Sequence, residues 1–168
     1  GKMYGYMTYG ENIKPDLICL GKGISSSLPM AAVVGTEEII DVDLGANLSG
    51  THAGNALGSA ACLANLEVLT DEDFQRDLKE RSNTFERRSH DLLKYECVKH
   101  INAKGMVVGI VFDTTERTNK IVFDCIENGV LPVCTFRESI KLGPPLTIPV
   151  DAIHEAFDVI EECIQRNQ

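Results

Sequence analysis

The sequence is poor in aromatic residues: it has no tryptophan, and aromatic side chains make up only 6% of its 168 residues. Long apolar runs are also missing, since no stretch approaches the roughly 20 residues that a membrane-spanning helix needs. Basic residues are the minority, with 16 Lys and Arg against 25 Asp and Glu and a formal net charge of -9. We therefore expect neither nucleic acid nor a membrane as the main partner.

The six cysteines include no C-x-x-C pair, and the four histidines show no spacing typical of a metal site. Most of the cysteines lie in apolar surroundings, as buried free thiols do. We expect reduced thiols, no metal ion and a cytoplasmic location. The sequence starts at Gly1 with no signal-peptide pattern, and we expect a fragment or a processed chain.

The first half of the sequence is predicted to be mixed α/β. Residues 17–20 and 30–35 are short apolar runs bounded by turn residues, so we predict two buried strands. A polar loop over residues 43–54 precedes a helix from about Asn55 to Leu69. Small residues fill this helix, and small side chains allow another backbone to approach closely, so we predict that it lies in a tight interior.

The second half changes to an α+β pattern. The predicted elements are a charged connecting helix over 71–95, strands over 106–112 and 139–142, an edge segment over 130–133, a helix over 118–128 that stops at Gly129, and a final helix capped by Asp151. A strand, a helix, further strands and a final helix on a charged connecting helix indicate a small α+β domain.

Lys22 directly follows the first apolar run and lies between Gly21 and Gly23. At the end of a buried strand, desolvation would favour the neutral, nucleophilic form of its amine. Such an amine forms a Schiff base with a carbonyl compound, including the aldehyde of pyridoxal phosphate. Taken alone, the Gly-Lys-Gly pattern is more typical of a turn lysine that points to solvent.

A second candidate site is the loop over residues 48–55, in which Ser49, Gly50 and Thr51 precede the predicted helix. Glycines, hydroxyls and free amides ahead of a helix N-terminus bind anions such as phosphate. An ordinary capped helix start has the same local pattern. A nucleophilic lysine and an anion loop together are what a phosphate-bearing aldehyde cofactor needs.

The order of these segments resembles that of class III aminotransferases, the pyridoxal-phosphate family that includes ornithine, acetylornithine and gamma-aminobutyrate aminotransferases. The matching segments, each with the family pattern, are residues 1–3 (the end of R-T-G-K-M), 15–23 (P-D-I-I-x-x-x-K-G), 28–32 (L-P-I-G-A), 51–56 (T-F-G-G-N-P) and 141–147 (R-L-x-P-P-L-T). They follow one another in order over nearly the whole chain, which is more specific than any single motif.

The resemblance implies that residues 1–72 are the C-terminal part of the fold-type I large domain, which binds pyridoxal 5'-phosphate. Residues 73–168 would be the connecting helix and a small α+β C-terminal domain. Lys22 would carry the Schiff base and move the proton, and Thr51 would contact the cofactor phosphate across the interface of a homodimer. The implied substrates are an amine or ω-amino acid as donor and a 2-oxo acid as acceptor.

Lys141 stands where many members of the family have the arginine that binds a substrate carboxylate. A lysine provides the charge without the bidentate fork, so the substrate class stays open. A surface position or a structural salt bridge is the alternative. In the family, the acidic partner of the pyridinium nitrogen precedes the segment matched by residues 1–3, so we expect the isolated chain to be inactive.

Two other functions fit the same residues. A racemase, epimerase or mutase of the same fold would use the same lysine for proton transfer. A non-catalytic remnant would act instead as an interaction or structural domain.

Overall fold

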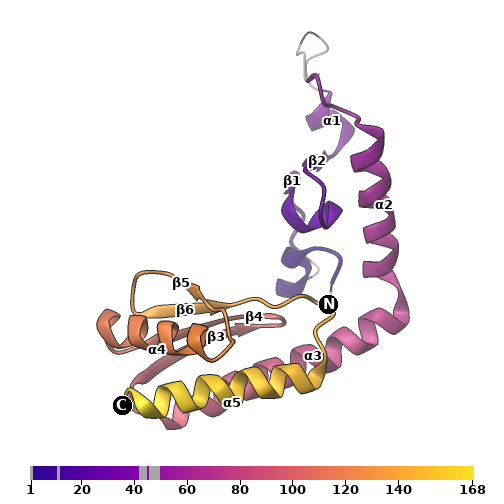
Figure 1. Ribbon diagram of the computed structural model, residues 1–168. Coiled ribbons are helices and arrows are strands. Elements are labelled where there is room, and N and C mark those ends of the chain that lie inside the picture. Colours follow the sequence, from indigo (N-terminus) through magenta and orange to yellow (C-terminus); the bar gives the residue numbers. More distant parts are fainter. Residues whose placement is uncertain (1, 11, 42–44, 46–49) are drawn as a thin grey trace. The chain divides into compact units, whose positions relative to one another are not determined.

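The computed structural model describes residues 2–10, 12–41, 45 and 50–168. These residues form two compact units, Lys2–Gln75 and Arg76–Gln168. Both units contain helices and strands, so the mixed α/β content predicted from the sequence is confirmed (Figure 1).

The first unit contains a small sheet and one long helix. Strand β1 (Leu17–Leu20) pairs antiparallel with strand β2 (Ala32–Gly35), and Leu17 stands opposite Gly35. A Cβ atom at Gly35 would come within 2.9 Å of the backbone oxygen of Asp16, which cannot move aside as a side chain can, so this register favours a glycine there. The other elements are the 3-10 helices η1 (Gly5–Tyr9) and η2 (Lys22–Ser25), the short helix α1 (Glu37–Ile40) and helix α2 (Ala56–Thr70).

The burial predicted for the first unit is wrong for the part of the chain that the structure describes. Here β1 and β2 pair only with each other. Apolar side chains on both strands are exposed, among them Leu17 at 47% and Val33 at 58%. Helix α2 buries only Gly58 and Cys62, so its small residues do not lie in a tight interior.

The second unit is a four-stranded antiparallel sheet packed with helices. Its strands follow the spatial order β3-β4-β6-β5. The elements are α3 (Glu72–Asp91), which begins in the first unit, η3 (Leu92–Lys94), β3 (Val98–Lys104), β4 (Val107–Phe112), α4 (Thr115–Glu127), β5 (Val133–Cys134), β6 (Ser139–Leu142) and α5 (Val150–Arg166). The predicted strand over residues 139–142 is confirmed, whereas β3 is a strand that the sequence did not reveal.

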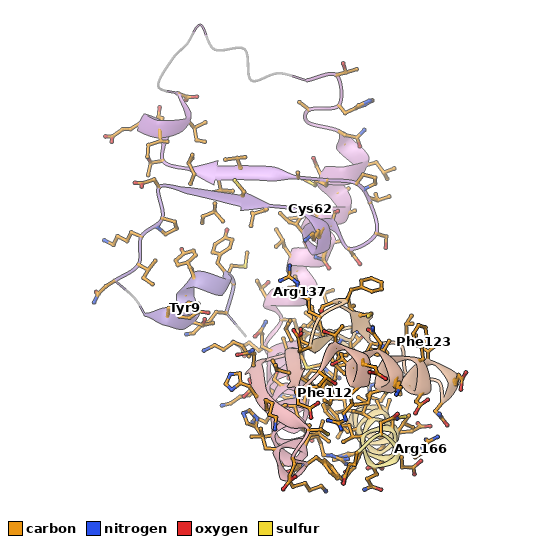
Figure 2. The ribbon with its side chains drawn as sticks, turned by 90° about the vertical axis from the view of Figure 1, so that its left-hand side faces the viewer. Tyr9, Cys62, Phe112, Phe123, Arg137 and Arg166 are labelled. Atoms are coloured by element: carbon orange, nitrogen blue, oxygen red, sulfur yellow. The ribbon has the colours of Figure 1, made fainter. Side chains whose placement is uncertain are left out.

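The core of the second unit joins the sheet to α3, α4 and α5. Helices α3 and α5 lie side by side (Figure 1), and the rings of Phe85 and Phe157 meet edge-on with centroids 5.3 Å apart. Fully buried side chains from β4, α4, β6 and α5 complete this core, among them Val108, Ile110, Ile121, Ile140, Ile153 and Ile160. Figure 2 shows the contrast between Phe112, which is buried, and Phe123, which is 66% exposed on α4.

Candidate active site

Lys22 is the first residue of η2 and comes just after β1. Its φ of 51° lies in the left-handed region, which residues with a side chain seldom adopt. A hydrogen bond from Ile24 N to Gly21 O, 3.2 Å long, closes the turn around it. The Lys22 side chain is exposed and forms no hydrogen bond or ion pair with the described residues. The amine is thus accessible, but these residues do not supply the desolvation that the sequence suggested.

Thr51 lies in the turn that leads to α2. A hydrogen bond from Ala53 N to Gly50 O (2.9 Å) closes this turn. The Asn55 side chain then caps α2 by accepting a hydrogen bond from Gly58 N at 2.9 Å. The Thr51 side chain is exposed and has no hydrogen-bond partner among the described residues, so its hydroxyl is available to a ligand. Ser49, from the same predicted loop, lies outside the described residues.

Asn65 connects helix α2, which follows the Thr51 turn, to the η2 turn that contains Lys22. The sequence did not single out this residue. It lies on α2, and its Nδ2 donates to Gly23 O at 2.8 Å and to Ile24 O at 3.1 Å. Those two carbonyls belong to the residues immediately after Lys22. The available signal was a single asparagine in a helix in which most other residues are small or apolar.

Lys141 belongs to the second unit, where it lies on β6. The strand register forms one row across the whole sheet, which contains Asn102, Gly109, Lys141 and Val133. Since side chains alternate along a strand, Lys141 lies on the face opposite its buried neighbours Ile140 and Leu142. Its side chain forms no ion pair with the described residues, so the structural salt bridge considered above is not seen there.

Lys141 also borders an apolar cavity of about 350 Å³ in the same unit. Phe157 and Ile160 of α5 and the prolines Pro144 and Pro145 form part of its wall, and Lys141 is its one charged lining residue. Leu142 also lines this cavity, and Lys141 lies on the opposite face of the sheet, so the cavity is not assigned as the place where Lys141 would bind a carboxylate.

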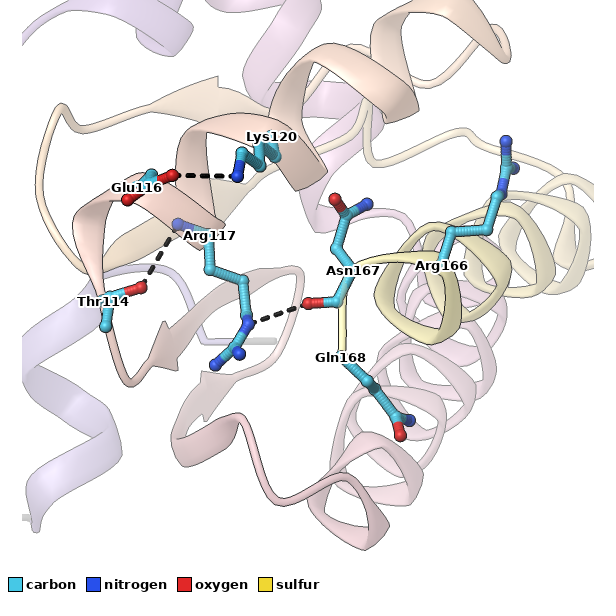
Figure 3. Close-up of a pocket in the computed structure, with 7 residues that line it drawn as sticks. All are labelled: Thr114, Glu116, Arg117, Lys120, Arg166, Asn167 and Gln168. Atoms are coloured by element: carbon cyan, nitrogen blue, oxygen red, sulfur yellow. Dashed lines mark hydrogen bonds and ion pairs between the residues drawn. The ribbon is translucent and has the colours of Figure 1, made fainter.

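A second cavity, of about 340 Å³, lies at the start of α4 and the end of α5 (Figure 3). Its basic side chains are already paired with acidic ones: Arg117 with Asp113, Lys120 with Glu116 at 2.8 Å, and Arg166 with Glu162 at 3.9 Å. The hydrogen bond from Arg117 lowers the pKa of Asp113 and keeps that partner charged. We do not assign a phosphate or substrate site here, because the positive charge is neutralised within the unit.

Three of the four cysteines of the second unit are too buried to serve as nucleophiles of a site. Cys97, Cys125 and Cys163 are buried, as the sequence predicted for most thiols. Burial raises the pKa of each of them, so they remain neutral thiols at physiological pH. Within the described residues, no cluster of three His, Cys, Asp or Glu offers a metal site, and no helix has the length and apolar content to span a membrane.

The chain matches the class III aminotransferase family over residues 1–164. It is 30% identical to the acetylornithine aminotransferase of Caldanaerobacter subterraneus over 98% of this chain and 41% of that protein. It is 31% identical to the mitochondrial ornithine aminotransferase of Rattus norvegicus, over 92% of this chain and 36% of that protein. The crystal structure of acetylornithine aminotransferase from Elizabethkingia anophelis superposes with a TM-score of 0.85 at 28% identity, over 98% of this chain and 42% of that one.

The chain therefore belongs to the class III aminotransferases, a family that depends on pyridoxal phosphate. Its relatives are mostly aminotransferases but include an alanine/serine racemase of Pyrococcus horikoshii, 30% identical over 92% of this chain and 34% of that protein. The chain spans about two fifths of the length of these relatives.

Proposed function

We propose that this chain supplies the cofactor-binding lysine of a pyridoxal-phosphate-dependent aminotransferase. The reaction would transfer an amino group between an amine or ω-amino acid and a 2-oxo acid. The observation that carries this proposal is Lys22, an accessible amine that has no partner among the described residues and lies on a defined turn after β1, within a chain of this family.

The residues of the first unit fit the cofactor in two respects. Lys22 Nζ would hold one cofactor covalently through its aldehyde, and the Thr51 hydroxyl, which has no partner among the described residues, would donate to the phosphate of the cofactor held by the partner subunit. When bound, pyridoxal phosphate supplies an electron sink for a substrate carbon that loses a proton. Lys22 Nζ would accept that proton and return it during the reaction. We propose that Thr51 acts in the partner's site of a homodimer.

Lys141 is proposed to hold the carboxylate of a substrate. Its ammonium has no acidic partner among the described residues, so it has no ion pair to break on binding a ligand. Gly109, its neighbour in the strand register, has no side chain to compete for the space beside it. A lysine binds a carboxylate as a point charge, so the contact would be less selective for geometry than an arginine fork.

We also propose how the chain divides: residues 1–72 as part of the cofactor-binding large domain and residues 73–168 as the connecting helix and small domain. We propose a cytoplasmic location as well, supported by the reduced state expected of the cysteines. The pyridinium partner that makes the cofactor an effective electron sink is not assigned in this chain, so the isolated 168 residues should not turn over.

The test is made on the protein expressed from its complete coding sequence. After incubation with pyridoxal phosphate and reduction with borohydride, peptide mass spectrometry should find the cofactor on Lys22. Lys22→Ala should remove both the label and the visible absorbance of the lysine-bound cofactor. Labelling of another lysine in the unaltered protein would refute the assignment.

The racemase alternative is favoured by one observation, the 30% identity to the alanine/serine racemase. Product analysis separates the two functions. An aminotransferase consumes its amino donor only when a 2-oxo acid is present, whereas a racemase inverts one amino acid without any acceptor. If the protein neither binds the cofactor nor turns over, the non-catalytic alternative is correct.

A further inference from the structure

The side chain of Asn65 leaves its own helix to bind another segment. Its Nδ2 donates to Gly23 O and Ile24 O, which lie more than 40 positions earlier in the chain. Both partners are carbonyl oxygens, which only accept hydrogen bonds, so the amide NH2 group must face them. The orientation of Asn65 is therefore fixed by its contacts.

Local structure offers no reason for an asparagine at this position. Within a helix interior asparagine is less favourable than alanine, because its side chain competes for backbone hydrogen bonds. Among the described residues, the Asn65 side chain donates both of its hydrogen bonds to η2 and none to α2. Its contribution comes from the segment that it holds.

That segment has an unfavourable backbone conformation. Lys22 has a φ of 51° and Ser26 a φ of 60°, and neither is a glycine. Such conformations persist only where surrounding contacts hold them. The backbone hydrogen bonds of this segment include those made by the amides of Ile24, Ser26 and Ser27, and the buried Ser25 hydroxyl donates to Leu28 O. Asn65 adds the anchor to α2.

We propose that Asn65 is a positioning residue, which fixes the turn of η2 so that the Lys22 amine is held at one place relative to the cofactor aldehyde. The proposal rests on the role of Lys22 given above. A lysine side chain has four flexible bonds, so a fixed backbone is the part of its placement that the protein can control. Bond formation between an amine and an aldehyde depends on this placement.

Three substitutions and one control separate positioning from simple packing. Asn65→Leu keeps the size but removes both donors, and Asn65→Asp keeps the shape but turns carboxylate oxygens toward two carbonyls. Asn65→Gln retains the amide on a longer side chain and should restore part of the effect. Thr70→Val is the matched control, because Thr70 lies on the same helix and its hydroxyl donates, among the described residues, only to carbonyls of that helix, Leu66 O at 2.8 Å and Glu67 O.

The first measurement needs no cofactor: hydrogen–deuterium exchange of the peptide over residues 23–28 in the protein expressed from its complete coding sequence. Loss of both donors should speed exchange there by roughly tenfold or more. Exchange in the middle of α2 should remain within about twofold of the parent. Asn65→Gln should lie between the parent and Asn65→Leu, and Thr70→Val should match the parent.

The second measurement is the rate at which free pyridoxal phosphate attaches to Lys22, followed by absorbance and by borohydride labelling. Asn65→Leu should slow attachment by roughly tenfold at saturating cofactor, whereas Thr70→Val should not change it. Unchanged exchange over residues 23–28, or equal acceleration there and throughout α2, would overturn the proposal. An unchanged attachment rate despite faster exchange would also overturn it. Absence of any label on Lys22 in the parent would refute the proposed function, whereas the exchange data would still decide whether Asn65 holds the turn.

Discussion

Tyr95 connects η3 to α5 and gives the sharpest prediction about the stability of the second unit. Its ring is buried, and its hydroxyl donates to Glu161 Oε1 and accepts from Gln165 Nε2, both at 2.7 Å. Glu161 also forms an ion pair with Lys94. The change Tyr95→Phe removes one oxygen and leaves the buried ring in place.

The expected loss follows from these two hydrogen bonds. A bond to a charged acceptor contributes about 1.5–3 kcal/mol. Gln165 is exposed, so water replaces its lost partner, and Glu161 keeps Lys94. We therefore expect Tyr95→Phe to destabilise the second unit by about 2 kcal/mol at neutral pH, which corresponds to roughly a 30-fold change in the opening equilibrium.

The loss should depend on pH. The hydrogen bond from Lys94, and next that from Tyr95, lower the pKa of Glu161 below its ordinary value of 4.5. A lowered pKa in the folded state gives a stabilisation that is complete above the unfolded value and is lost as the pH falls through the folded value. The difference between parent and Tyr95→Phe should therefore be full near pH 7 and should shrink below about pH 4.

Hydrogen–deuterium exchange of α5 peptides measures this loss, after correction for the intrinsic exchange rate at each pH. Tyr4→Phe is the control, because the Tyr4 hydroxyl has no hydrogen-bond partner among the described residues. An effect of Tyr95→Phe below about threefold at pH 7, or an equal effect at pH 3 and pH 7, would refute the reasoning.

Three further predictions concern the candidate site and the isolated chain. Lys141→Met should raise KM for carboxylate substrates and spare simple amines; equal effects on both would instead indicate a structural role. Thr51→Ala should weaken cofactor binding by roughly 1.5–3 kcal/mol, and an unchanged affinity in a confirmed dimer would contradict the phosphate contact. The isolated 168-residue chain should show no aminotransferase turnover, and it should associate in size-exclusion chromatography because β1 and β2 have free edges; a monomer that turns over would contradict both expectations.

The elements with strong local signals were predicted closely. The strand over residues 17–20 has the bounds of β1, and the helix expected from Asn55 begins at Ala56, with Asn55 as its cap. Gly129 ends α4 as predicted, since its φ of 88° suits glycine and its amide bonds to Ile126 O. In these places the helix or strand begins or ends at a residue whose type, such as a capping asparagine or a glycine, already marks such an end in the sequence.

The errors in the second unit have identifiable causes. Strand β3 was missed because its register shifts between Val98 and His100, which breaks the alternation that marks a strand. The helix predicted to Tyr95 ends earlier, since η3 interrupts it. Asp151 is not the cap of α5: Pro149 is, and Asp151 lies within the first turn, where its charge suits the helix dipole.

The site was predictable as residue types but not as contacts. Lys22 and Thr51 stand beside glycines and turn residues that mark unusual backbone, and a sequence shows this directly. Asn65 acts on Gly23 and Ile24 from a distant part of the chain, and only the fold brings them together. Periodicity describes what a residue does within its own element, so it carries no information on a contact of this kind.

The exposure of the first unit bears on how Lys22 would work. The sequence argument required a buried strand to desolvate the amine, yet Lys22, Leu17 and Val33 are all exposed within the described residues. Positional control and desolvation are therefore separate contributions. The described residues supply the first, through the left-handed turn and the bonds from Asn65. Desolvation requires that something cover β1 and η2. Bound pyridoxal phosphate would cover them together with further polypeptide, which could come from a partner subunit or from the same protein. A reactive lysine on this turn thus needs both the local geometry that the chain encodes and a surface that closes over it.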